Sequence, residues 1–228
     1  MPPGFISARQ LLLVIAFDWT SSGAYLRRYG RPDAFAPWVP AGSPLEVSLG
    51  RGGLAWERAF VTPGVSPGPT KREGDGCSPA GAFPVTALFG VSAPAAGAKL
   101  PWLQATRDLK CVDDPASRHY NRIVDLNSVD CIDWNSCEDM LRTDGRYEVG
   151  AVVGCNVDPV EPGAGSCIFL HVREAPGAPT AGCSALARDD MIALAAWLDG
   201  ARSPWLVQLP HAAYADLRGP WRLPELLA

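Results

Sequence analysis

The sequence predicts a mainly β protein of the α+β class, a mixed β-sheet sandwich with one or two packed helices. Its 228 residues include 23 glycines and 22 prolines, a content typical of many turns and short strands. Short apolar runs bounded by turn residues recur along the chain, from 11–17 to 205–209. A convincing helical period is found in one segment, 188–198. With 47% hydrophobic residues, the chain can bury a full core.

The first part of the chain is predicted to be a short arm followed by strands. We expect residues 1–9 to form the arm and residues 10–228 to form a single domain, because the length fits one large domain. Apolar runs predict four strands, which turn residues 21–23 and 50–53 join into hairpins: 11–17, 23–28, 45–49 and 53–57. A targeting signal is the alternative interpretation of 11–17, but no small-residue cleavage site follows, so a strand is favoured.

Loops and strands alternate through the middle of the chain. A surface loop with three prolines is predicted at 62–70, and a loop of small residues at 93–98. A short helical turn is expected around 136–142. Strands are predicted at 81–89, 121–126, 149–153 and 166–171, the last of them buried and ending at His171.

Residues 188–198 are predicted to form a helix. Asp189 and Asp190 lie in its first turn, where negative charge suits the helix dipole, and Gly200 follows as a stop signal. Its apolar face recurs at steps of three and four residues, at Met191, Leu194, Ala195 and Leu198. After this helix, the run 205–209 predicts a last strand.

Charge and composition exclude several classes of protein. The net charge is −4 without basic clusters, so the chain has no electrostatic footprint for nucleic acid. No apolar run reaches the length that a membrane span requires. Zinc is not expected, because no Cys-x-x-Cys or clustered Cys/His spacing is present, and we expect no other metal or cofactor. We expect a monomer.

The seven cysteines favour an oxidising compartment. If Cys183 is kept free for chemistry, six remain, enough for three disulfides among fifteen possible connectivities. The alternative is a reduced chain with several buried thiols. The six candidates are Cys77, Cys111, Cys131, Cys137, Cys155 and Cys167.

The pairing of Cys183 with His171 points to nucleophilic chemistry. A thiol needs a neighbouring base to become a nucleophile at neutral pH, and a strand ending in His171 followed by a loop ending in Cys183 can supply both. Gly182 permits a tight turn and leaves the backbone amides there unobstructed for an oxyanion. Taken singly, however, a cysteine near an apolar run is usually a small core residue.

Two separated motifs resemble the L,D-transpeptidase catalytic domain, also called the YkuD domain. His171 is followed by Thr180, Gly182 and Cys183 in the family's His…Ser/Thr-x-Gly-Cys pattern, and residues 71–83 resemble its upstream K-x-E-G-D-x-x-T/S-P-x-G-x-F segment. Residues 113–115 with 120–121 resemble one branch of the family, and the likeness runs from about residue 10 to about residue 210. The loop before Cys183 is shorter than in many relatives, and residues 184–186 lack the Arg or Asn found there in many members.

The resemblance implies a cysteine acyltransferase that acts on peptidoglycan stem peptides in the periplasm or cell envelope. It implies a thioester on Cys183, with His171 as base and a backbone carbonyl orienting the imidazole. The acceptor is the amine of a second stem or of a protein. Water as acceptor instead gives an L,D-carboxypeptidase or endopeptidase, and a non-catalytic cell-wall binding module is a further alternative.

Four side chains are candidates for substrate binding, each with an ordinary alternative. Thr180 either hydrogen-bonds near the thiol or satisfies local backbone groups. Arg173 either meets a stem carboxylate or is an exposed surface arginine. Tyr120 and Arg122 either line the cleft or belong to a solvated loop.

Overall fold

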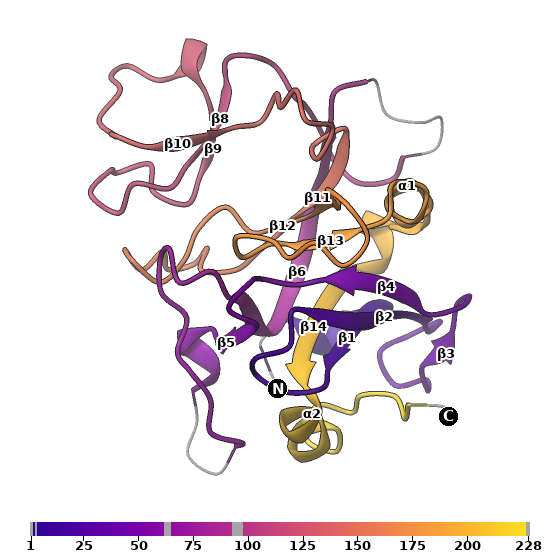
Figure 1. Cartoon of the computed structure of the whole chain (residues 1–228). Coiled ribbons are helices and arrows are strands. Elements are labelled where there is room, and N and C mark those ends of the chain that lie inside the picture. The colour runs from indigo at the N-terminus through magenta and orange to yellow at the C-terminus, as the bar shows by residue number, and fades with distance from the viewer. Residues whose placement is uncertain (1, 3, 62–64, 93–97, 227–228) are drawn as a thin grey trace.

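The computed structural model describes residues 2, 4–61, 65–92 and 98–226, and it has the predicted mainly β fold with two α-helices (Figure 1). The main sheet contains β1 (Gln10–Ala16), β2 (Gly23–Gly30), β3 (Val39–Pro40), β4 (Leu45–Ser48), β5 (Leu54–Trp56), β6 (Ser78–Gly90), β7 (Trp102–Gln104), β11 (Val149–Val153), β12 (Phe169–Val172), β13 (Ser184–Leu186) and β14 (Pro204–Pro210). A second sheet contains β8 (Leu109–Val112), β9 (Ile123–Asp125) and β10 (Cys137–Asp139). The helices are α1 (Arg188–Trp197) and α2 (His211–Leu217), and four short 3-10 helices span Phe5–Ser7, Arg58–Phe60, Leu126–Ser128 and Gly200–Arg202.

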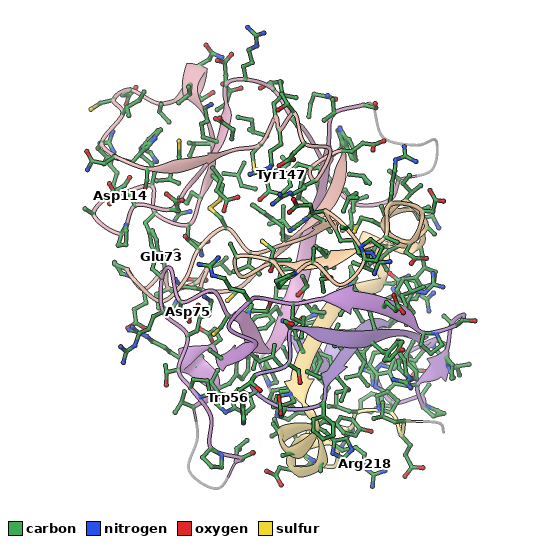
Figure 2. All side chains as sticks on the ribbon, viewed as in Figure 1. Trp56, Glu73, Asp75, Asp114, Tyr147 and Arg218 are labelled. Atoms are coloured by element: carbon green, nitrogen blue, oxygen red, sulfur yellow. A yellow bond between two sulfur atoms is a disulfide. The ribbon has the colours of Figure 1, made fainter. Side chains whose placement is uncertain are left out.

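The main sheet closes on itself. Its strand order is β1-β14-β6-β11-β12-β13-β4-β2-β3, and β1 also pairs with β2. β5 and β7 each pair with β6, outside this path. The smaller sheet, with the order β10-β8-β9, lies at the end of the molecule opposite α2 and both chain ends (Figure 1). Tyr147 lies where the two sheets approach one another (Figure 2).

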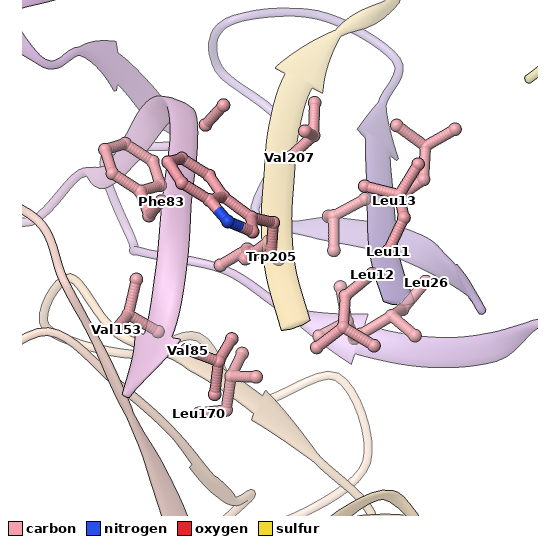
Figure 3. Packing of buried hydrophobic residues seen from close by; sticks show 14 of the residues in the cluster. Leu11, Leu12, Leu13, Leu26, Phe83, Val85, Val153, Leu170, Trp205 and Val207 are labelled. Carbon is pink, nitrogen blue, oxygen red and sulfur yellow. The ribbon is translucent and has the colours of Figure 1, made fainter. Parts of the chain in front are cut away.

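The main core explains the most apolar strands of the sequence. In β1, Leu11, Leu12 and Leu13 are fully buried, because this strand pairs with a neighbour on each side and is covered on both faces. Trp205 and Val207 of β14 lie beside them (Figure 3). Burial of apolar area of this kind is the main favourable term in folding.

The structure confirms the predicted helix and most of the predicted strands. Met191, Leu194 and Ala195 of α1 are buried, and the helix packs on β11 and β12. Helix α2 was not predicted from the sequence; it begins directly after Pro210, which sits at its N-cap. In the parts of the chain that the structure describes, no helix has the length and hydropathy to cross a membrane.

Three local expectations were wrong. Residues 136–142 do not form a helical turn, because Cys137–Asp139 instead pairs antiparallel with β8 as β10. Residues 50–53 do not join a hairpin: β4 pairs with β2 and β13, whereas β5 pairs with β6. The arm expected at 1–9 is not separate from the domain where the structure describes it, since Phe5 is 1% exposed, stacks on Trp38 and packs edge-on against Trp205. Of the two predicted loops, 62–64 and 93–97 lie outside the described residues.

The cysteines form one disulfide rather than the three expected. Cys111 of β8 is bonded to Cys167, just before β12, so the bond joins the small sheet to the main sheet. The other five are free; Cys155 is buried in the main core and Cys131 is exposed. The fold brings Cys111 and Cys167 within bonding distance, which the spacing of the cysteines in the sequence does not reveal.

Counting thiols tests this pairing. Alkylation of the unfolded chain without reductant should modify five thiols, and reduction beforehand should raise the number to seven. Intact-mass spectrometry reads both numbers directly. A single modified thiol before reduction would instead match three disulfides and contradict the structure.

Candidate active site

The parallel pairing of β12 with β13 brings His171 and Cys183 together. His171 is the register partner of Ala185, and Leu170 is the partner of Ser184. Paired residues lie on the same face of a sheet, and side chains two apart on one strand share a face. Cys183, two residues before Ala185, therefore lies on the face of His171. Both side chains line one small pocket of about 100 Å³.

The Cys183 thiol is held by two backbone groups of the neighbouring chain. The sulfur accepts a hydrogen bond from the N–H of Phe169 at 3.3 Å, and the thiol donates to the carbonyl of Cys167 at 3.4 Å. The residue is 9% exposed, in an apolar cluster that includes Phe89 and Met140. Burial raises the pKa of the Cys183 thiol to about 12, so the resting sulfur is protonated at neutral pH.

His171 is oriented by its own backbone. Its Nδ1 lies 2.8 Å from the carbonyl oxygen of Val172. A carbonyl only accepts, so Nδ1 carries the proton and Nε2 keeps a free lone pair. Burial, together with the charges of Arg146 and Arg142, lowers the pKa of His171 to about 4. The imidazole is therefore neutral at pH 7, and among the described residues no hydrogen bond joins it to the Cys183 thiol.

The loop before Cys183 is fixed through the carbonyl of that residue. The hydroxyl of Thr180 donates to the carbonyl at 2.6 Å, and the hydroxyl of Ser78 donates to it at 2.7 Å. Thr180 also accepts from the N–H of Gly182 at 3.1 Å. Gly182 has φ +152°, and a Cβ there would lie 3.3 Å from the carbonyl oxygen of Cys77. Both the backbone angle and the space favour glycine.

These contacts leave one backbone donor for an oxyanion. The N–H of Gly182 is engaged by Thr180, whereas the N–H of Cys183 has no hydrogen-bond partner within the described residues. The expected pair of donors is therefore reduced, in the resting structure, to the amide of Cys183.

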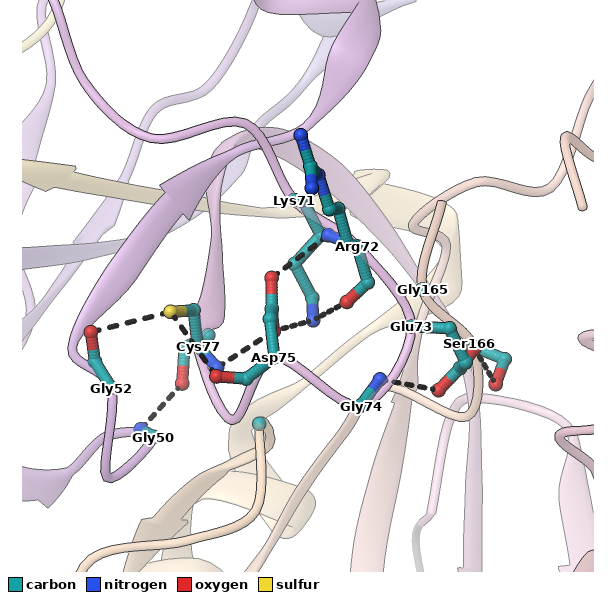
Figure 4. A network of polar contacts seen from close by, with 12 residues as sticks. Gly50, Gly52, Lys71, Arg72, Glu73, Gly74, Asp75, Cys77, Gly165 and Ser166 are labelled. Carbon is teal, nitrogen blue, oxygen red and sulfur yellow. Dashed lines mark hydrogen bonds and ion pairs between the residues drawn. The ribbon is translucent and has the colours of Figure 1, made fainter. Parts of the chain in front are cut away.

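The block 71–83 is a structural brace. Asp75 accepts from the ammonium of Lys71 at 2.5 Å and from the N–H groups of Arg72 and Cys77, each at 2.8 Å (Figure 4). Lys71 is 3% exposed, so this ion pair satisfies a buried charge. The hydrogen bond from Cys77 fixes this turn at the start of β6, the strand that begins with Ser78.

Glu73 extends the brace to the segment beside the thiol. Its Oε2 accepts from the hydroxyl of Tyr120 at 2.5 Å and from that of Ser166 at 2.7 Å. The Tyr120 oxygen in turn accepts from the N–H of Gly165. Asn121 accepts from the N–H of Cys167, whose carbonyl accepts from the Cys183 thiol. Motif residues distant in sequence thus position the acceptor of the Cys183 thiol.

The candidates for substrate binding lie in different places. Thr180 lines the pocket, although its hydroxyl is engaged with the backbone. Arg173 pairs with Glu46 at 3.3 Å and does not line the pocket. Tyr120 is buried against Glu73, and Arg122 is exposed, also outside the pocket.

The sequence interpretation missed the charged and aromatic residues that the small sheet and the loop after it contribute to the pocket. Glu138, Arg142, Arg146 and Tyr147 line the pocket with His171 and Cys183. They come from β10 and the loop after it, and only Glu138 and Arg142 lie in the segment 136–142 that was interpreted as a helical turn. The sequence does show charged residues clustered near Tyr147, which could have marked them as site candidates. No local sequence pattern, however, indicates that this segment lies next to β12. In the described parts of the chain, no group of three or more His, Cys, Asp or Glu residues can hold a metal ion.

The lowered pKa of His171 makes stability depend on pH. The unfolded imidazole titrates near 6.5 and the folded one near 4, so between these values the unfolded chain binds more protons. Stability contributed by the neutral imidazole is present above pH 6.5 and is lost as the pH falls. From pH 7 to pH 4, the free energy of unfolding should fall by about 3 kcal/mol more in the wild type than in His171→Gln. Urea unfolding of both proteins at a series of pH values measures this difference. If the free energy of unfolding of the two proteins falls equally with pH, the imidazole is not held neutral by burial.

Comparison with protein-family models finds a match over most of the chain. No curated protein and no solved structure matches the chain. The family model of the L,D-transpeptidase catalytic domain matches residues 43–207, well over half of the chain, and this range includes both the block 71–83 and the segment from His171 to Cys183. The chain belongs to the L,D-transpeptidase catalytic domain family.

Proposed function

We propose that this catalytic domain transfers the acyl group of a peptidoglycan stem peptide through a thioester on Cys183. The observation that carries the proposal is the shared pocket of the Cys183 thiol and the His171 imidazole, whose Nε2 is left free by the hydrogen bond at Nδ1. A thiol with a base beside it is the arrangement that cysteine acyl transfer requires. Membership of the family supports peptidoglycan as the substrate, and the shared pocket supports Cys183 and His171 as the nucleophile and base.

In the first step, the thiol gives its proton to Nε2 of His171 as the sulfur attacks the carbonyl carbon before the terminal D-amino acid. The N–H of Cys183 stabilises the oxyanion that develops, an effect worth roughly 3–4 kcal/mol for a good donor. The C–N bond then breaks and the imidazolium returns its proton to the leaving amine. Because burial favours the neutral forms of both groups, the proton moves during attack and not before it.

In the second step, an acceptor amine attacks the thioester. A C–N bond forms, the C–S bond breaks, and His171 carries a proton from the amine to the sulfur, restoring the thiol. The partner is a second stem or a protein that presents an amine. Water in place of the amine gives an L,D-carboxypeptidase or endopeptidase with the same site.

We place this activity in the cell envelope. The substrate is found there, and the Cys111–Cys167 disulfide suits an oxidising compartment such as the periplasm. Reduction of that bond would release the segment whose carbonyl accepts from Cys183.

Mass spectrometry of the intact protein tests the proposal. Incubation with a stem tetrapeptide should release the terminal D-amino acid and leave an acyl adduct on the wild type. Cys183→Ala should form no adduct and lose at least about 10³-fold in release, since the nucleophile is gone. Cys131→Ala, which removes an exposed free thiol, is the matched control and should react as the wild type does.

The outcomes separate the alternatives. Dimers or exchanged terminal amino acids identify a transpeptidase, whereas a trimmed tripeptide alone identifies a carboxypeptidase. Binding of the tetrapeptide without adduct or turnover in the wild type would leave a binding module and refute the enzyme.

A further inference from the structure

An acidic side chain lies in the wall of the pocket beside the nucleophile. Glu138 comes from β10 of the small sheet and lines the pocket together with Cys183 and His171. Its negative charge raises the pKa of the Cys183 thiol, second only to burial, which agrees with its position close to the sulfur. The steps of acyl transfer described above make no use of this carboxylate.

Glu138 differs from the other charged residues of the pocket in having no ionic partner. Arg142 and Arg146 both pair with Asp144, and Arg146 also pairs with Glu174 at 2.5 Å. These two positive and two negative charges balance. Among the described residues, no cation lies within ion-pair distance of Glu138. The pocket therefore holds one negative charge that has no ion-pair partner, although the charge of Arg142 acts on it from a longer distance.

The hydrogen bonds of Glu138 leave one oxygen unused. Its Oε2 accepts from the hydroxyl of Tyr147 at 2.5 Å (Figure 2 shows Tyr147), and Oε1 accepts from no group that the structure describes. Tyr147 itself packs edge-on against the His171 ring, with centroids 5.5 Å apart. The tyrosine thus fixes the carboxylate in the pocket wall at a set position relative to the catalytic pair.

The surroundings of Glu138 penalise its charge. Burial raises the pKa of this carboxyl and the carboxylate of Asp113 adds to the rise, while the hydrogen bond from Tyr147 and the charge of Arg142 oppose it. One Asp113 oxygen is itself buried without a hydrogen-bond partner. A partly buried carboxylate that lacks an ion-pair partner costs free energy, which a bound cation offsets. Unpaired charges of this kind concentrate at binding and catalytic sites.

The size and composition of the pocket select the kind of cation. A divalent metal needs several oxygen ligands, and Glu138 is a single carboxylate with one free oxygen. A guanidinium is broad and planar, and two guanidinium groups already line this pocket of about 100 Å³. A primary ammonium is a compact charge with three donors on a flexible stem, and it fits one carboxylate oxygen.

We propose that Glu138 is the subsite for an alkylammonium group of the substrate, held next to the Cys183 thioester. The inference rests on the proposed function and adds a specificity-determining residue to it. Two sources can present this chemistry: the acceptor amine that attacks the thioester, and an amine on the side chain of the donor stem.

Glu138→Gln tests the subsite with little risk to the fold, because the amide oxygen can still accept from Tyr147. The donor is a stem tetrapeptide used in two forms, with its side-chain amine free or acetylated, and the acceptor is a stem tripeptide with a free amine. Release of the terminal D-amino acid measures acylation. The ratio of cross-linked to hydrolysed product, followed against acceptor concentration, measures capture of the acceptor.

If the acceptor is the source, Glu138→Gln should require at least about tenfold more tripeptide for half-maximal transfer, with acylation by the acetylated donor within about twofold of the wild type. If the donor is the source, KM should rise by a similar factor for the free-amine donor and not for the acetylated one. Asp139→Asn is the matched control, because Asp139 follows Glu138 on β10 and is exposed and paired with Lys110. It should change neither quantity.

Equal behaviour of wild type and Glu138→Gln in both assays would overturn the subsite while the thioester on Cys183 stands. Absence of any adduct in the wild type would refute the proposed function, and the subsite with it. The two failures are therefore distinguishable.

Discussion

The parallel pairing of β12 with β13 is the constraint on which the site depends. It aligns His171 with Ala185 and lets the Cys183 sulfur contact the backbone of Phe169 and Cys167. Hydrogen bonds from the surrounding motifs stabilise this pairing. Ser78 and Thr180 donate to the carbonyl of Cys183, and Glu73 accepts from Ser166 in the segment before β12. In this family member, the most recognisable sequence block therefore serves as a brace.

Much of the fold could be predicted because its patterns are local. The leucine run of β1 and the three- and four-residue steps of α1 each follow from burial of one element. The errors lie where distant segments decide the outcome. Residues 137–139 are a strand because β8 lies beside them, and β5 leaves its neighbour β4 to pair with β6. No local period encodes such partners.

The same distinction holds for the site. Cys183, His171 and Gly182 could be predicted as site residues because they share a short stretch of chain and a family pattern. Glu138 and Tyr147 were missed because they reach the pocket from the small sheet and the loop after it, and the Cys111–Cys167 disulfide that ties that sheet to β12 could not be assigned from spacing. The family pattern thus predicts Cys183 and His171, whereas the pocket around them depends on tertiary contacts.

The central claim is that the site rests as a neutral thiol–imidazole pair, with Nε2 of His171 free to take the thiol proton. Long-range ¹H–¹⁵N NMR of the labelled protein measures the state of both ring nitrogens directly. At pH 7 the account predicts a proton on Nδ1 and none on Nε2, unchanged until the pH approaches about 4. An imidazolium at pH 7, or a neutral ring with its proton on Nε2, would contradict it.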